Sequence, residues 1–314
     1  MVNQLNLIKN ENMKFKSSPK VWIFILVIIV AVVVESIVIH NFSKNDSDWR
    51  EVAKNQIEAT EIQLQGDGLP DDIKSEMEDQ VNLYKYALDN DVSTHFEGSL
   101  WKAMTDSSIL SVIVIILSLI IASESVAGEY SQGTIKLLLI RKAKRWEVLL
   151  SKYIHVVIWG ALLTLIMLIT SFIVNLFFYD LSFSNQINLV INQGEVVEKS
   201  QIIYLLQNYL SILLELIIYI SLAFMVSVII KSSSIAITIS MGMLLIGPSL
   251  AMYLADKFEW IKYSLFTNTD IIQYIDMSPT VNGTTMGFSL CILAVYFIVF
   301  HICSFFIFTK RDVY

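Results

Sequence analysis

Cysteine, proline, glycine and charged residues are all scarce in this chain of 314 residues. It has 2 cysteines, 4 prolines and 11 glycines, and only 16% of its residues are charged. Cys291 and Cys303 lie in one apolar segment, where a helix would hold them roughly 18 Å apart, too far for a disulfide. Because 55% of the residues are hydrophobic, we expect a chain solvated largely by lipid.

Motifs for catalysis are absent as well. The sequence contains neither H-E-x-x-H nor G-x-S-x-G, and its 4 histidines are scattered. No glycine is followed by lysine, which excludes a P-loop. We therefore expect no enzyme and no cofactor or metal on this chain, so that any energy source would come from a partner.

Six long apolar runs dominate what is present, and the mean hydropathy is +0.61. About 20 helical residues cross a hydrocarbon core about 30 Å thick. The first run is too long for a signal peptide and lacks a small-x-small cleavage site, so we interpret it as a retained helix. The predicted spans are 21–39, 107–127, 153–178, 204–230, 235–254 and 287–308. The predicted fold class is an all-α polytopic integral membrane protein with six transmembrane helices and a small extracellular helical hairpin between the first two.

The polar segments have distinct characters. Residues 40–106 carry fifteen acidic and six basic side chains in two helical patterns around a break at 66–70, which predicts the acidic hairpin. This hairpin attracts cationic peptides or simply keeps the surface solvated. Residues 1–20 predict a basic amphipathic helix at the cytoplasmic surface, or a frayed tail. The other connections are 128–152, 179–203, 231–234 and 255–286, and the tail is 309–314. A short re-entrant or interfacial helix is expected at 258–275, within the last connection.

Lysine and arginine are unevenly divided between the two sides. Both termini, 123–152 and 231–234 carry 13 of these cations over about 60 residues, whereas the opposite side carries 9 over about 125. The positive-inside bias predicts cytoplasmic termini and an extracellular hairpin. We expect the plasma membrane of a bacterium as the location.

The basic stretch 124–152 has an apolar centre that needs a partner surface. Its pattern A-G-E-Y-S-Q-G-T-I-K-L-L-L-I-R, followed by R-W-E-V-L-L-S-K-Y, resembles the cytoplasmic loop of ABC-2 type transporter permeases. That loop is written E-x-x-x-G-T-I-K-x-L-L, then S/R-R-x-x-x-L-x-S-K. The LIKNENMKF run, the six spans and the closing F-x-x-x-K-R-D-V extend the resemblance over the whole chain. The matching loop residues are Glu129, Gly133, Thr134, Ile135, Lys136, Leu138, Leu139, Arg145, Leu149, Ser151 and Lys152. The large insertion at 40–106 departs from the shortest members of that family.

The resemblance implies a transmembrane subunit that works with two copies of a cytoplasmic ABC ATPase and with a second copy of itself or a related permease. Apolar anchors would enter a groove of the ATPase and charges at the rim would set the register. The expected anchors are Ile135, Leu137 and Leu138, and the expected rim is Glu129, Lys136, Arg141 and Arg145. Gly133 would allow a bend, and Tyr130 and Thr134 complete the expected docking residues. Alternatively, the stretch lies on anionic lipid headgroups.

Two carboxylates fall within predicted spans. Glu35 lies near the outer end of the first span, and Glu215 lies in the middle of the fourth, where an ionised side chain is costly unless it faces protein or water. Each contributes to a translocation path or to an interhelical hydrogen bond. Gly247 and Pro248 predict a kink in the fifth span.

The expected activity is export of amphipathic or antimicrobial peptides, lipids or drugs, with antimicrobial peptide resistance as one outcome. A membrane sensor or scaffold for an extracellular ligand, signalling through a cytoplasmic partner, is the alternative, and an intramembrane enzyme is the weaker third. Membrane lipids are expected contacts, and nucleic acid is not.

Overall fold

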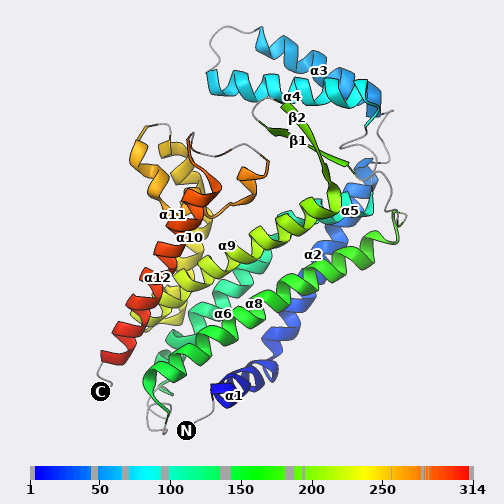
Figure 1. Ribbon diagram of the computed structural model, residues 1–314. Coiled ribbons are helices and arrows are strands. Elements are labelled where there is room, and N and C mark those ends of the chain that lie inside the picture. The colour runs from blue at the N-terminus through cyan, green and yellow to red at the C-terminus, as the bar shows by residue number, and fades with distance from the viewer. Residues whose placement is uncertain are drawn as a thin grey trace.

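Six long apolar helices form an elongated bundle that carries a small domain at one end (Figure 1). The computed structural model describes residues 4–43, 49–65, 71–92, 99–134, 143–179, 181, 187–192, 195–255, 257–276, 279, 281 and 283–310. Both termini lie at the same end of the bundle, which we name the inner end; the opposite end, with the small domain, is the outer end.

Each of the six helices is long and apolar enough to cross a membrane. The chain is therefore an all-α multi-pass membrane protein, and the predicted fold class is confirmed. The spans are α2 (Pro19–Ser43), α5 with η1 and α6 (Leu100–Asp106, Ser107–Leu110 and Ser111–Ser131), α8 (Arg145–Asn175), α9 (Gln201–Ile229), α10 (Ser233–Ala255) and α12 (Met286–Lys310).

The third span begins eight residues earlier than predicted. Residues 145–152 form the first two turns of α8, and the Glu147 side chain accepts a hydrogen bond from the Lys144 backbone N–H at 2.9 Å, which caps the helix. Glu129 likewise belongs to α6. The predicted loop 128–152 is thus corrected to the shorter connection between Ser131 and Arg145.

Helix α9 lies at the centre of the bundle against α6. The Ser227 hydroxyl donates to the Ser123 carbonyl at 2.7 Å and accepts from the Ala127 N–H at 2.9 Å, which ties the two helices together in an apolar interior. Leu216 and Tyr219 of α9 are fully buried there. By contrast, α2 and α12 expose most of their apolar side chains, as expected for helices that face lipid.

The predicted N-terminal helix is α1 (Gln4–Lys16), and it packs on the bundle. Leu7 is buried, and the Gln4 side chain donates to the Glu147 carbonyl of α8 at 3.0 Å. A turn at Ser17 and Ser18 separates α1 from α2. The inner end of α8 is therefore fixed to the start of the chain.

The small outer domain contains the predicted helical hairpin and a strand pair that was not predicted. Helices α3 (Trp49–Leu64) and α4 (Asp71–Asp89) pack side by side, and strands β1 (Ile187–Asn192) and β2 (Glu195–Ser200) pair antiparallel next to α4 (Figure 1). Trp49, Ala87 and Leu189 form its buried core. The connection 179–203, predicted only as a loop, therefore contains a strand pair.

The connection 255–286 has three short helical turns instead of the predicted single helix at 258–275. They are η2 (Glu259–Tyr263), α11 (Leu265–Asn268) and η3 (Ile272–Tyr274). Asn268 is buried and donates to the carbonyls of Lys262 and Ser264 at 2.8 and 2.7 Å. These bonds hold the segment folded against the outer end of α12, where the Ser289 hydroxyl donates to Asn268.

Replacing Gly247 with alanine is expected to lower stability by about 1–3 kcal/mol through overpacking. A Cβ at Gly247 of α10 would lie 2.5 Å from the ring of Phe266 in α11. Gly242, in the same helix, has no atom within 4 Å of its would-be Cβ, so Gly242→Ala is the matched control and should be neutral or slightly stabilising. Thermal unfolding in detergent measures both; equal melting temperatures would contradict this packing.

Candidate functional site

The predicted docking residues flank one connection at the inner end. Glu129 and Tyr130 lie in the last turn of α6, Gly133 and Thr134 follow it, and Arg145 begins α8. The predicted anchors and their cationic neighbours, Ile135, Lys136, Leu137, Leu138 and Arg141, lie outside the described residues. What the structure shows is therefore the turn that precedes this stretch and the helix that follows it.

Gly133 ends α6 with a left-handed backbone. Its φ is +69°, a value that glycine adopts without the steric cost of a Cβ, and its N–H donates to the Tyr130 carbonyl at 3.2 Å. The Thr134 hydroxyl donates to the Glu129 carbonyl at 3.4 Å. The chain thus turns sharply at the position where a bend was predicted.

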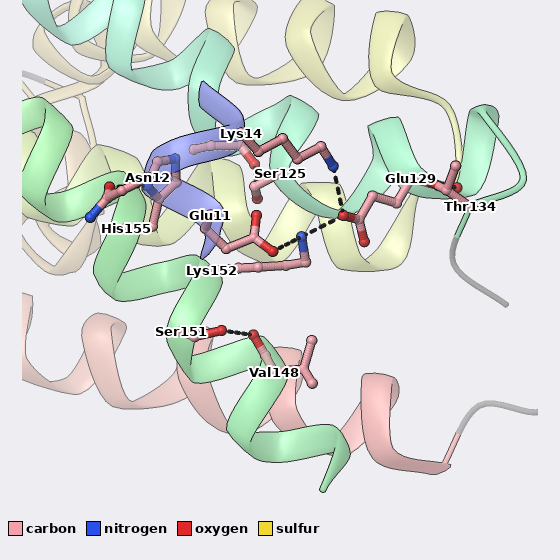
Figure 2. Close-up of polar contacts among 11 residues, drawn as sticks. Glu11, Asn12, Lys14, Ser125, Glu129, Thr134, Val148, Ser151, Lys152 and His155 are labelled. Carbon is pink, nitrogen blue, oxygen red and sulfur yellow. Dashed lines mark hydrogen bonds and ion pairs between the residues drawn. The ribbon is translucent and has the colours of Figure 1, made fainter. Parts of the chain in front are cut away.

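A network of ion pairs joins α1, α6 and α8 beneath this turn (Figure 2). Lys152 Nζ lies 2.7 Å from Glu129 Oε1 and 3.1 Å from Glu11 Oε1. Lys14 Nζ lies 3.1 Å from the same Glu129 oxygen. The two cations and two carboxylates therefore neutralise one another, and they come from three helices that are far apart in the sequence.

The centre of this network is shielded from solvent. The Lys152 side chain is 1% exposed and that of Glu129 is 5% exposed, whereas Lys14 is 64% exposed. Glu129 Oε2 has no hydrogen-bond partner among the described residues. Removing one member of a buried pair leaves an uncompensated charge, so the position of each helix depends on the other two.

A second group of side chains fastens α1 to α8 next to the ion pairs. Asn12 Oδ1 lies 2.6 Å from His155 Nδ1 and accepts a hydrogen bond from Trp159 Nε1 at 3.0 Å. The Phe15 ring contacts both aromatic rings edge-on, with centroids 5.5 Å from His155 and 4.9 Å from Trp159. Asn12 and Phe15, three residues apart, present one face of α1 to α8 (Figure 2 shows Asn12 and His155).

Two further contacts connect the base of the turn with other spans. Lys231, between α9 and α10, lies over the Tyr130 ring with its Nζ 5.7 Å from the centroid. Arg145 donates to the Thr309 carbonyl in the last turn of α12 at 3.1 Å. A displacement of the turn would therefore also act on α12 and on the connection between α9 and α10.

A cavity of about 310 Å³ lies among α1, α6 and α8 at this end. Glu11, Glu129 and Lys152 line it, and Lys20 and Glu124, paired at 2.7 Å, also border it. Among the described residues, no group of three or more His, Cys, Asp or Glu side chains is arranged to hold a metal ion. The chemistry that the site offers is charge pairing and mechanical linkage.

The two residues predicted for the translocation path, Glu35 and Glu215, lie in different surroundings. Glu215 lines a cavity near the outer end, together with Ser211. Glu35 accepts a hydrogen bond from the Ser107 hydroxyl at 2.8 Å, and it is not among the residues that line the cavities described here. Glu35 thus has the interhelical hydrogen bond that was the alternative for it.

Sequence reasoning missed the contribution of α1 to the site. Glu11, Asn12, Lys14 and Phe15 were assigned to an amphipathic helix and to a run that resembles the family, with no contact to the docking stretch, and His155 was regarded as isolated. Their spacing on one face of α1 is a usable signal, but the sequence does not reveal which helix that face meets. The Glu129–Lys152 pair could have been suspected, since both residues stand in the same motif.

Comparison with known proteins gives a family and two relatives. Residues 75–314 match the family described as "Protein of unknown function (DUF2705)". "Uncharacterized protein YhcI" of Bacillus subtilis (strain 168) is 34% identical over 314 residues, covering 98% of this chain and 99% of that protein. "Uncharacterized membrane protein YdbK" of the same organism is 30% identical over 208 residues, covering 65% of this chain and 79% of that protein. The chain belongs to the DUF2705 family.

Proposed function

We propose that this protein is the transmembrane subunit of an ABC-2 type transporter, driven by a separate ATPase. The observation that carries the proposal is the buried pair of Glu129 and Lys152. Both belong to the motif that resembles the permease loop, and they close the base of the segment between them. A loop that pushes on a membrane bundle needs such a rigid base.

In this proposal the segment that follows Thr134 docks in a groove of the ATPase. Ile135, Leu137 and Leu138 supply apolar anchors, while Lys136, Arg141 and Arg145 supply charges at the rim. ATP and Mg are bound by two ATPase subunits, and a second permease copy or a related permease completes the transporter. Because Glu129 and Lys152 join α6, α8 and α1, movement of the docked segment would shift these helices together.

The same proposal sets orientation and location. The inner end holds the basic stretch and both termini, so the positive-inside bias places it in the cytoplasm of a bacterial cell. The outer domain then lies outside the plasma membrane. Amphipathic peptides, lipids or drugs are the proposed cargo, and export is the proposed direction.

Replacing Leu138 with aspartate is the direct test, since a charge in an apolar groove would abolish docking. The tagged chain is purified in mild detergent from its source cells, and the co-purifying ATP hydrolysis is measured together with any P-loop subunit detected by mass spectrometry. Leu138→Asp, or Ile135→Asp, should reduce both by at least about tenfold, from a loss of about 1.4 kcal/mol or more in binding.

Ile62→Asp is the matched control, because Ile62 is 70% exposed on α3 in the outer domain. It makes the same change of charge at the opposite end and should leave co-purification unchanged. Membrane insertion of all variants is checked by fractionation. Co-purification that survives both inner substitutions would refute the docking role.

A sensor or scaffold is the second candidate, favoured by one observation. The outer domain lies over a cavity at the outer end, since Leu83 of α4 and residues of β1 line it together with residues of the bundle. Reconstituted transporter distinguishes the two functions: a ligand that stimulates ATP hydrolysis and is itself moved across the vesicle supports transport, whereas one that is bound but never moved supports sensing.

A further inference from the structure

Two neighbouring cavities lie at the outer end of the bundle, away from the docking site. The larger, with a volume of about 550 Å³, lies between the outer domain and the bundle, and the smaller, of about 220 Å³, lies deeper between α6, α9 and the segment before α12. Ser108 and Asn208 border both cavities. A volume of several hundred Å³ is typical of sites for small organic molecules.

The larger cavity has an apolar wall and an acidic wall. Leu83 of α4 and Leu189 and Val190 of β1 supply apolar surface from the outer domain. Asp106 and Asp276 supply carboxylates from the bundle side. A molecule that matches both walls must have an apolar part and a cationic part.

The acidic wall is incompletely neutralised. Asp106 is paired with Lys102, and Asp276 accepts a hydrogen bond from the Tyr204 hydroxyl at 3.0 Å. Burial raises the pKa of Asp276, an effect opposed by the Tyr204 hydrogen bond and by nearby Lys199 and Lys102. A carboxylate that is costly to ionise in the empty site gains from a bound cation.

The deeper cavity continues the acidic lining. Glu215 and Asp270 border it, so four carboxylates line the two cavities against the single lysine Lys102. No hydrogen bond or ion pair of the Glu215 carboxyl is found among the described residues.

Glu215 is thus a half-buried carboxylate in the wall of a cavity, with no partner among the described residues. Intramembrane carboxylates are costly and usually mark a binding site or a path. Neutral lipid or water satisfies the apolar wall or the polar wall but not both. An amphipathic cation satisfies both walls and offsets the excess of negative charge.

We propose that these two neighbouring cavities bind a small amphipathic organic cation, with its apolar part against the outer domain and its cationic group among the carboxylates. Such a molecule would be the cargo, or the end of a larger cargo, of the transporter. Only that last step rests on the proposed function. Binding itself requires this chain alone, so its failure and the failure of ATPase docking are separable results.

Equilibrium dialysis of the full chain in nanodiscs of zwitterionic lipid tests the proposal, with tetraphenylphosphonium as the probe. Triphenylphosphine oxide, neutral and of similar apolar surface, is the comparison ligand, and empty nanodiscs correct for partition into lipid. The expected result is saturable binding of the cation at least tenfold tighter than that of the neutral compound. Equal binding of the two would overturn the proposal.

The Asp106→Asn/Asp276→Asn double variant should weaken binding of the cation at least tenfold. Its control, Glu58→Gln/Asp89→Asn, removes two charges from exposed positions of the outer domain and should change affinity less than twofold. Equal loss in both double variants would show that only surface charge attracts the probe, which would refute the site.

Glu215→Gln provides the second variant, because Glu215 has no partner to lose and its replacement keeps the same shape. Its melting temperature should equal that of the wild type while the affinity for the cation falls severalfold. Unchanged affinity in Glu215→Gln and in the Asp106/Asp276 variant would exclude the cavities as the binding site.

Discussion

Lys152→Met is expected to lower the free energy of unfolding by about 3 kcal/mol, near the lower end of what losing one partner of a buried pair costs. Lys152 is 1% exposed, and its removal leaves Glu129, itself buried, with only Lys14 as a cationic neighbour. Unfolding in mixed micelles, followed by tryptophan fluorescence, measures the loss. Under the proposed function the same variant should also lose most of the co-purifying ATP hydrolysis, because the charge link between the inner ends of α6 and α8 is removed.

Lys20→Met is the matched control for this substitution. It removes a lysine that is also paired with a glutamate, Glu124 at 2.7 Å, but whose side chain is 51% exposed. Exposed pairs contribute about 0–1 kcal/mol, so this variant should remain near wild type. If Lys152→Met lowered the free energy of unfolding no more than Lys20→Met does, the Glu129–Lys152 pair would not be what stabilises the inner end.

The Glu129→Leu/Lys152→Met double variant separates stability from function. Replacing both buried charges by apolar side chains is often neutral or stabilising, so most of the lost stability should return. If the charges also position the docking segment, the co-purifying ATP hydrolysis should stay low although the double variant has regained its stability. Recovery of both properties would assign the pair a purely structural role.

The spans were predictable because hydrocarbon thickness dictates the length of an apolar helix. The start of α8 was not, because Arg145, Glu147 and Lys152 lower the hydropathy of residues that are nevertheless helical. The cap between Lys144 and Glu147 decides the boundary there, and Lys152 is tolerated inside because Glu129 and Glu11 neutralise it. Hydropathy reports the preference of a segment for lipid and is insensitive to such pairing.

The candidate site was predictable only in part for a related reason. Glu129 and Arg145 could be selected from a local motif, whereas Glu11 contacts Lys152 across 141 residues of sequence. No local pattern specifies that contact. The pairing of β1 and β2 was missed similarly, because a six-residue strand such as Ile187–Asn192 is stabilised by Trp49 and Ala87 from a distant part of the chain.

Trp49→Ala should unfold the outer domain while leaving the bundle folded. Trp49 is 7% exposed and packs with Ala87 and Leu189, which form the buried core of this domain. Truncation of a buried tryptophan costs about 3–5 kcal/mol, and a small domain has little stability to spare. Few polar contacts remain to compensate, among them the Lys85–Glu61 ion pair at 2.7 Å, which is exposed.

Hydrogen exchange followed by mass spectrometry gives the result by segment. Because about 1.4 kcal/mol corresponds to tenfold, amides of α3, α4 and β1 should lose protection by 100-fold or more, with those of α6 and α9 unchanged. Ile62→Ala, on the same helix but 70% exposed, should change nothing. Because Leu83 and Leu189 line the larger cavity, Trp49→Ala should also abolish binding of the cation. Lost protection with undiminished binding would show that the outer domain does not form the apolar wall of that site.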